Sequence, residues 1–358
     1  MRALALALLA AVLIGAAFAI SRGLPDDPTG PPDASGNTRA PAETLPPVAP
    51  FPTIDASTSL LVVAPHPDDE VLCCAGVIQR VLQAGGHATV VWITSGDASE
   101  LDLIVVEKSL FVAPQKLRDL AARRMEEARK ATTQLGLTAD QQIFLGYPDR
   151  GVLSLLTEHF ATPYFSKFTA SEAVPYDKTL SPGSPYTGES LERDFATVLD
   201  RTQPTLILAP SPRDAHTDHQ AAAILTMRAM SQRHELDRVR YWIVHGGEPW
   251  PFPRGYHPTL AQTPSPRSKG LNPVAFQLTL TEIDKKVAAL RAYETQLKVM
   301  SSYLMAFVRT TELYSADPMP KRSTAPVAGA NGPATDPAPP LFAPAHGAAT
   351  RVAASGAR

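Results

Sequence analysis

Along the middle of the chain, short aliphatic runs alternate with stretches in which apolar residues recur at helical spacing. The run Leu60–Ala64 is short and rich in β-branched residues, which predicts a buried strand, and residues 71–82 follow at helical spacing. Further strands are predicted in 88–97, 141–151, 204–212 and 239–247, and further helices at 116–136, 189–202, 219–232 and 281–300. Such alternation predicts an α/β fold: a three-layer, Rossmann-like, mostly parallel sheet with helices on both faces.

The two ends of the chain differ in composition from this middle part. Residues 1–20 begin with Met-Arg, continue with an apolar run and end near Ala17-Phe18-Ala19, which predicts a signal peptide or a membrane anchor. Both alternatives place the protein outside the cytoplasm, in the periplasm or the extracellular space, with a possible membrane tether. Residues 21–56 are expected to form a Pro-rich linker and residues 316–358 a disordered Ala/Pro-rich tail, which leaves 57–315 as the folded domain.

Composition narrows the range of partners and of metal sites. The net charge is -2 and no basic patch stands out, so nucleic acid is not expected as a partner, and no protein partner is evident. The chain has 2 cysteines, the neighbours Cys73 and Cys74, which we expect to be small buried thiols. They supply neither a disulfide framework nor a thiolate metal site. The irregular stretch 152–188 is too long for an ordinary connection, which predicts a lid, a binding loop or local disorder.

Polar side chains cluster directly after two of the predicted strands. The first cluster is Pro65-His66-Pro67-Asp68-Asp69-Glu70, and the second, within 211–222, contains His216, Asp218 and His219. Each cluster alone is also typical of turns and helix caps. Because the carboxyl ends of parallel strands meet at one edge of a sheet, the two clusters together favour a shared site. Three nitrogen or oxygen ligands with one open position are typical of catalytic zinc.

These motifs resemble those of the LmbE/PIG-L family of zinc-dependent N-acetylglucosaminyl deacetylases. Supporting similarities lie in 124–136, 144–151 and 285–296. The resemblance implies that His66, Asp69 and His219 bind Zn²⁺, that Asp68 is the general base, and that His216 stabilises or protonates the tetrahedral intermediate. It further implies that Asp218 orients His216, and that Arg124 and Asp149 face the sugar.

The implied reaction is zinc-dependent hydrolysis of the N-acetyl group of a GlcNAc-containing glycan, glycolipid or glycoside. Two alternatives stay open: a metal-dependent phosphoesterase whose extra carboxylates hold a second ion, and a non-catalytic glycan-binding module of the cell envelope. The segment with His245, Trp250 and Phe252 fits either a wall on which a sugar stacks or a loop packed over the sheet edge.

Overall fold

The computed structural model describes residues 50–99 and 113–320. The predicted signal peptide or anchor, the linker up to residue 49 and the tail beyond residue 320 lie outside the described residues. Among the residues that are described, no helix is long and apolar enough to cross a membrane.

A five-stranded parallel sheet forms the centre of the fold. Its order is β3-β2-β1-β4-β5, and its strands are β1 (Ser59–Ala64), β2 (His87–Thr94), β3 (Gln142–Tyr147), β4 (Leu206–Pro210) and β5 (Val239–Trp242). Leu60 of β1 pairs with Ala88 of β2 on one side and with Leu206 of β4 on the other. The chain order reverses between β1 and β4, and a crevice for ligands is expected outside the carboxyl ends of the strands at such a point.

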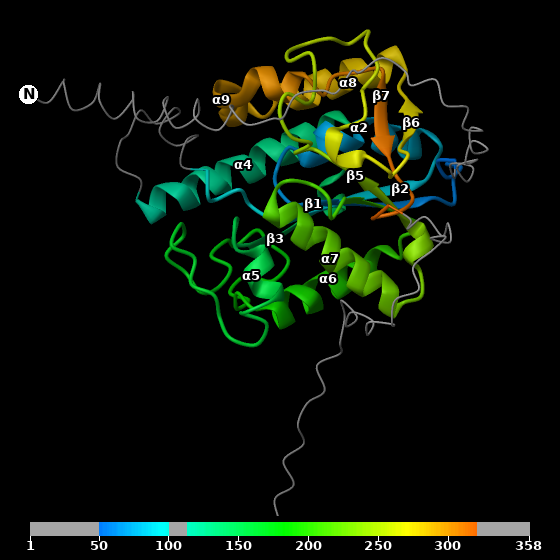
Figure 1. Ribbon diagram of the computed structural model, residues 1–358. Coiled ribbons are helices and arrows are strands. Elements are labelled where there is room, and N and C mark those ends of the chain that lie inside the picture. Colours follow the sequence, from blue (N-terminus) through cyan, green and yellow to red (C-terminus); the bar gives the residue numbers. More distant parts are fainter. Residues whose placement is uncertain (1–49, 100–112, 321–358) are drawn as a thin grey trace, which may run out of the picture. The chain divides into compact units, whose positions relative to one another are not determined.

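Helices cover both faces of this sheet (Figure 1). One face carries α2 (Asp69–Gln83), α4 (Pro114–Gln134) and α8 (Leu280–Arg291), and α8 contacts both of the others. The opposite face carries α5 (Val152–Leu156), α6 (Gly188–Thr202) and α7 (Thr217–Gln232). The predicted three-layer α/β architecture is therefore confirmed.

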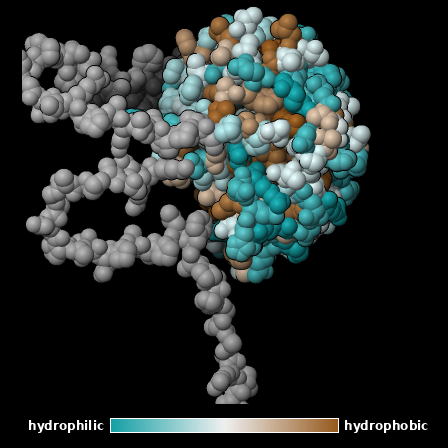
Figure 2. All heavy atoms as spheres, turned by 90° about the vertical axis from the view of Figure 1, so that its right-hand side faces the viewer, coloured by the Kyte–Doolittle hydropathy of each residue, from teal (hydrophilic) through white to brown (hydrophobic). Residues whose placement is uncertain are grey.

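A large hydrophobic core fills the space between the layers, and Ala98, Leu117, Leu120 and Phe168 form a second, smaller cluster. The strand residues of β1 from Leu61 to Ala64 are fully buried, and Trp92 of β2 stacks on Phe144 of β3 with ring centroids 4.2 Å apart. On the molecular face in Figure 2, hydrophilic residues predominate and hydrophobic ones lie among them in small groups. The aliphatic runs of the sequence thus became strands buried on both faces.

The remaining described elements lie mostly in the C-terminal part. They are α9 (Glu294–Met305), the 3₁₀ turns Ala139–Gln141, Leu236–Arg238 and Pro266–Ser268, and the antiparallel pair β6 (Val274–Gln277) and β7 (Thr311–Tyr314). The single late helix predicted over 281–300 is wrong, because α8 and α9 are separate. The backbone of Tyr293 leaves the helical region between them, and its hydroxyl donates a hydrogen bond to Glu70 at the start of α2.

Two further expectations need correction. The stretch 152–188 is ordered rather than locally disordered: it contains α5, and its Tyr176 and Tyr186 side chains are buried. Cys73 and Cys74 are both buried, as expected, but they are not thiols. Their sulfur atoms are joined in a disulfide between consecutive residues of α2.

Candidate active site

The loop after β1 brings the first polar cluster to the edge of the sheet. Asp69 and Glu70 form the first turn of α2, where negative charge is favoured by the helix dipole. Asp69 Oδ2 also accepts a hydrogen bond from the backbone N–H of His66, at 2.9 Å. Asp68 has a φ of +127°, a backbone conformation that is unfavourable for a residue with a side chain. The loop is therefore held in a special conformation at the motif itself.

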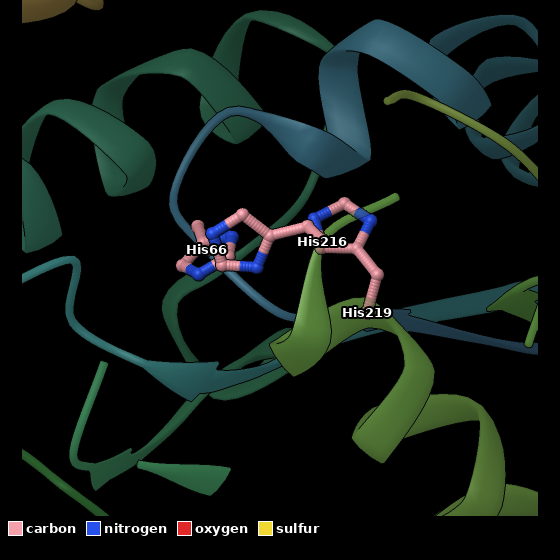
Figure 3. Close-up of side chains that lie close together, drawn as sticks. All are labelled: His66, His216 and His219. Carbon is pink, nitrogen blue, oxygen red and sulfur yellow. The ribbon is translucent and has the colours of Figure 1, made fainter. Parts of the chain in front are cut away.

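The second cluster forms the start of α7. His216 is the N-cap residue, and its Nδ1 accepts a hydrogen bond from the backbone N–H of Asp218, at 3.2 Å. Figure 3 shows the result: His66 from the loop after β1 meets His216 and His219 from α7. One ring nitrogen of each of the three histidines lies within 4.8 Å of the others. The two segments that are far apart in sequence therefore meet, as predicted.

Three side chains converge on a position that suits a metal ion. Asp69 Oδ2 lies 3.4 Å from His66 Nδ1 and 3.2 Å from His219 Nε2. His219 Nε2 is buried and has no hydrogen-bond partner among the described residues, although that oxygen is so near. A buried nitrogen that faces an oxygen without bonding to it is explained if both atoms are ligands of one ion. Two imidazole nitrogens and one carboxylate oxygen fit Zn²⁺ with one position left open.

Asp214 supports His219 from behind, and sequence reasoning did not single it out. Its Oδ2 lies 3.3 Å from His219 Nδ1 and accepts hydrogen bonds from the backbone N–H groups of Val244 and His245, at 2.9 and 3.0 Å. Although burial opposes ionisation, the charge of His219 holds the pKa of Asp214 below its usual value. The sequence signal that could have identified Asp214 is its position two residues before His216, within the same polar cluster.

Asp149 and Asp218 both lie against His66. Asp149 Oδ1 is 3.4 Å and Asp218 Oδ2 is 3.3 Å from His66 Nε2. Asp218 Oδ2 also accepts a hydrogen bond from the backbone N–H of Arg150, at 2.6 Å. The Asp218 carboxylate thus contacts His66. Its contact with His216 is made by the backbone N–H of Asp218 instead. A carboxylate behind a ligating histidine fixes its tautomer and its ring orientation.

Asp68, His216 and His245 also lie next to this position, outside the three converging side chains. Burial, together with the adjacent Asp69 carboxylate, raises the pKa of Asp68 well above its usual value. Burial and the nearby His66 and His219 lower the pKa of His216 to about 4. His216 is therefore neutral at pH 7, and because its Nδ1 accepts the Asp218 N–H, its proton resides on Nε2.

A cavity of about 140 Å³ opens in front of these groups. It is lined by His66, Asp68, Asp69, Leu72, Ala98, Ser99, Arg124, Asp149, Arg150, His216, Val244, His245, Met300 and Tyr303. Arg124 is held there by donating a 2.9 Å hydrogen bond to the carbonyl oxygen of Gly96. Of the predicted site residues, only Asp218 and His219 lie outside this lining. The lining combines charged residues, such as Arg124 and Asp149, with apolar ones, such as Leu72 and Met300.

The loop after β5 contributes Val244 and His245 to the cavity, and its Trp250 packs inside the fold. His245 lines the cavity and stacks on Tyr303, with ring centroids 6.3 Å apart. Trp250 is buried, lies edge-on against Phe307 and donates a 2.8 Å hydrogen bond to the carbonyl oxygen of Thr263. For Trp250 the packed-loop alternative is confirmed, whereas Phe252 is 65% exposed.

Comparison with known proteins gives consistent matches. Residues 61–230 match the model of the PIG-L family, described as GlcNAc-PI de-N-acetylase. A 1D-myo-inositol 2-acetamido-2-deoxy-alpha-D-glucopyranoside deacetylase from Kribbella flavida is 26% identical over 57% of this chain and 62% of its own length. A protein of the same name from Mycobacterium sp. (strain KMS) is 26% identical over 68% of this chain and 75% of its own length.

Among solved structures, the A40926 pseudoaglycone deacetylase Dbv21 is 20% identical, covers 72% of this chain and 96% of its own, and has a TM-score of 0.45. The family match spans β1, β4 and the first turns of α2 and α7, which carry both polar clusters. Both polar clusters and the similarities at 124–136 and 144–151 lie within the residues 61–230 that match the PIG-L family model, whereas 285–296 lies outside them.

Proposed function

We propose that this protein is a zinc-dependent deacetylase that hydrolyses the N-acetyl group of a GlcNAc-containing glycan, glycolipid or glycoside. The observation that carries the proposal is the convergence of His66 Nδ1 and His219 Nε2 on one oxygen of Asp69. The unpaired nitrogen of His219 is explained by an ion at that point. The relatives, named as deacetylases of a 2-acetamido sugar linked to inositol, support the substrate class.

The bound ion and the side chains have separate tasks in this reaction. When bound, Zn²⁺ supplies Lewis acidity, which makes water a nucleophile near neutral pH and polarises a carbonyl group. Asp68 accepts the proton of the attacking water, as a general base within the cavity. Its raised pKa makes the Asp68 carboxylate a stronger base than an ordinary aspartate.

His216 stabilises the charge that develops on the carbonyl oxygen. Its neutral ring presents Nε2–H, and a positioned donor of this kind stabilises an oxyanion without a net charge of its own. The C–N bond then breaks, the proton on Asp68 passes to the amine, and acetate and the free amino sugar leave. In this scheme Asp68 carries the proton, so His216 acts as a hydrogen-bond donor rather than as a cationic acid.

Arg124 and Asp149 are placed to bind the sugar, since both are charged residues that line the cavity. Asp149 also lies against His66, so one carboxylate connects the sugar subsite to the ligand trio. Substitution of Asp149 is therefore expected to affect both KM and metal affinity, whereas substitution of Arg124 is expected to act mainly on KM.

The proposal is tested by zinc content and amine release in the same preparations. Wild type and Asp68→Ala are assayed with 1D-myo-inositol 2-acetamido-2-deoxy-alpha-D-glucopyranoside and with N,N′-diacetylchitobiose. We expect one zinc per chain in both proteins and amine release by wild type only. Unchanged amine release by the variant would refute Asp68 as the base. Two ions per chain with phosphatase activity would favour a phosphoesterase, and glycan binding without metal or turnover would favour a binding module.

We also propose that the protein is exported and is either released or tethered to the membrane by residues 1–20. Cell fractionation of the full chain and of a form that begins at residue 21 tests this. Export is refuted if both forms stay in the cytoplasm.

A further inference from the structure

The first turn of α9 reaches across to the loop that carries Asp68. Gln296 Nε2 donates a hydrogen bond to Asp68 Oδ2 and a second one, of 2.9 Å, to the carbonyl oxygen of Pro67. Gln296 is fully buried, and 228 residues separate it from Asp68 in the chain. One amide group therefore holds both the side chain of Asp68 and the backbone just before it.

The loop around Asp68 needs such support, because its conformation is unfavourable by itself. A non-glycine residue with a φ of +127° keeps that backbone only where its surroundings enforce it. Within the loop, the Asp68 N–H donates to Glu70 Oε2 at 3.2 Å, and Glu70 in turn accepts a hydrogen bond from the hydroxyl of Tyr293. Tyr293 immediately precedes α9. The start of this helix therefore holds the loop on both sides of Asp68, through Gln296 at Pro67 and Tyr293 at Glu70.

That helix start is itself anchored. The N–H and hydroxyl groups of Thr295 donate to the Glu127 carboxylate of α4, and the hydroxyl bond is 2.6 Å long. Thr295 is fully buried. The turn Tyr293–Gln296 is therefore a rigid support rather than a mobile segment, and a side chain fixed on it can define where Asp68 points.

We propose that Gln296 is a positioning residue for Asp68, whose amide keeps the carboxylate turned toward the cavity where the attacking water lies. This inference rests on the proposed function, in which Asp68 takes the proton of that water. Gln296 is not among the residues that line the cavity, so it acts through Asp68 and not on the substrate.

The test compares Gln296→Met, which keeps the length of the side chain and removes the amide, with Thr295→Val. Thr295→Val removes a hydroxyl bond in the same turn without touching Asp68. We expect Gln296→Met to lower kcat about 10- to 100-fold, the size expected when a catalytic group is misplaced by about 1 Å, with KM and zinc content unchanged. Thr295→Val is expected to lower Tm and to leave kcat within about twofold.

A double-mutant cycle with Asp68→Asn separates positioning from a general disturbance. If Gln296 acts through Asp68, Gln296→Met costs no further activity once Asp68 is replaced. An equal loss in both backgrounds, full kcat in folded Gln296→Met, or an equal loss of kcat in Thr295→Val would each overturn the inference. Gln296→Leu serves as a second, smaller variant, and failure of both to fold would make Gln296 a residue of stability alone.

A second measurement does not depend on turnover. Crystal structures of wild type and Gln296→Met are expected to show the Asp68 side chain rotated in the variant, and an unmoved Asp68 would overturn the inference. The two proposals fail differently: unchanged activity of Asp68→Asn refutes the proposed base, whereas an inactive Asp68→Asn beside a fully active Gln296→Met refutes only the role of Gln296.

Discussion

Asp214 Oδ2 lies 3.3 Å from Nδ1 of His219, on the side of the ring away from Asp69. The same oxygen accepts hydrogen bonds from two backbone N–H groups just after β5, those of Val244 and His245. The imidazole of His219 is thus held between two carboxylates, one that shares its proposed ion and one that is fixed to the sheet edge.

Replacing Asp214 is expected to weaken metal binding, because carboxylates behind ligating histidines typically contribute 10- to 100-fold in affinity. For Asp214→Asn we expect a loss of roughly that size in zinc affinity, measured by competition with a chromogenic chelator. Asp194→Asn is the matched control, since Asp194 is a buried carboxylate that accepts a hydrogen bond from Tyr147 away from the histidines. Equal affinity of Asp214→Asn and wild type would contradict the supporting role.

His216→Ala is expected to act on the chemical step and not on metal binding. Removal of one donor to an oxyanion typically costs about 10²- to 10³-fold in kcat. We expect a loss of that order, with zinc content unchanged. Measurement of kcat and zinc stoichiometry distinguishes a hydrogen-bond donor from a metal ligand. A variant that loses zinc in parallel with activity would place His216 among the ligands.

Asp97 is expected to make stability depend on pH. Burial, reinforced by Asp149, raises the pKa of Asp97 to about 7 although it accepts hydrogen bonds from the Tyr176 hydroxyl and the Asp149 N–H. The folded protein then binds this proton more tightly than the unfolded chain. The contribution of the Asp97 proton to the free energy of unfolding is fully present below about pH 4. It is lost as pH rises through 7, and it amounts to up to roughly 4 kcal/mol.

Urea unfolding of wild type and Asp97→Asn between pH 5 and 8, with a chelator present to remove metal binding from the comparison, measures this contribution. We expect the free energy of unfolding to fall less with rising pH in the variant. Parallel pH profiles of the two proteins would show that Asp97 is ionised in the folded state without cost.

Lys286 and Glu312 form a buried ion pair that joins α8 to β7. Lys286 Nζ donates to Glu312 Oε1 and to the carbonyl oxygen of Leu72 in α2, both at 2.9 Å. Lys286→Met leaves Glu312 buried without its cation, which is expected to cost about 3–5 kcal/mol of unfolding free energy. Denaturant unfolding of Lys286→Met and of the exposed neighbour Lys285→Met compares the two, and equal stability would contradict the expectation.

The sequence predicted the sheet and both polar clusters because each depends on local patterns. The apolar runs are short and continuous, and His66 and His219 each follow such a run closely in the chain. The carboxyl ends of parallel strands lie at the same edge of a sheet. Two local patterns were therefore enough to predict that the two polar clusters lie close together. The same reasoning could not separate α8 from α9, because the break at Tyr293 depends on a hydrogen bond to Glu70.

The contributions of Asp214 and Gln296 to the site could not be predicted from local sequence patterns, for a related reason. An aspartate near a turn and a glutamine within a helix are common, and nothing nearby in the chain shows what they contact. Asp214 gains its role from His219 and from the end of β5, and Gln296 from a loop 228 residues away. Residues that support a site through tertiary contacts become visible only once the fold is known.

The strand order has a consequence for how such a protein can diversify. The proposed metal ligands and Asp68 follow two adjacent strands, β1 and β4, whereas the connections after β2 and β5 line the same cavity with Ala98, Ser99, Val244 and His245. Exchange or lengthening of those connections would leave the reactive centre intact. Changes in these loops alone could therefore alter which substrate fits, while the buried reactive residues stay the same.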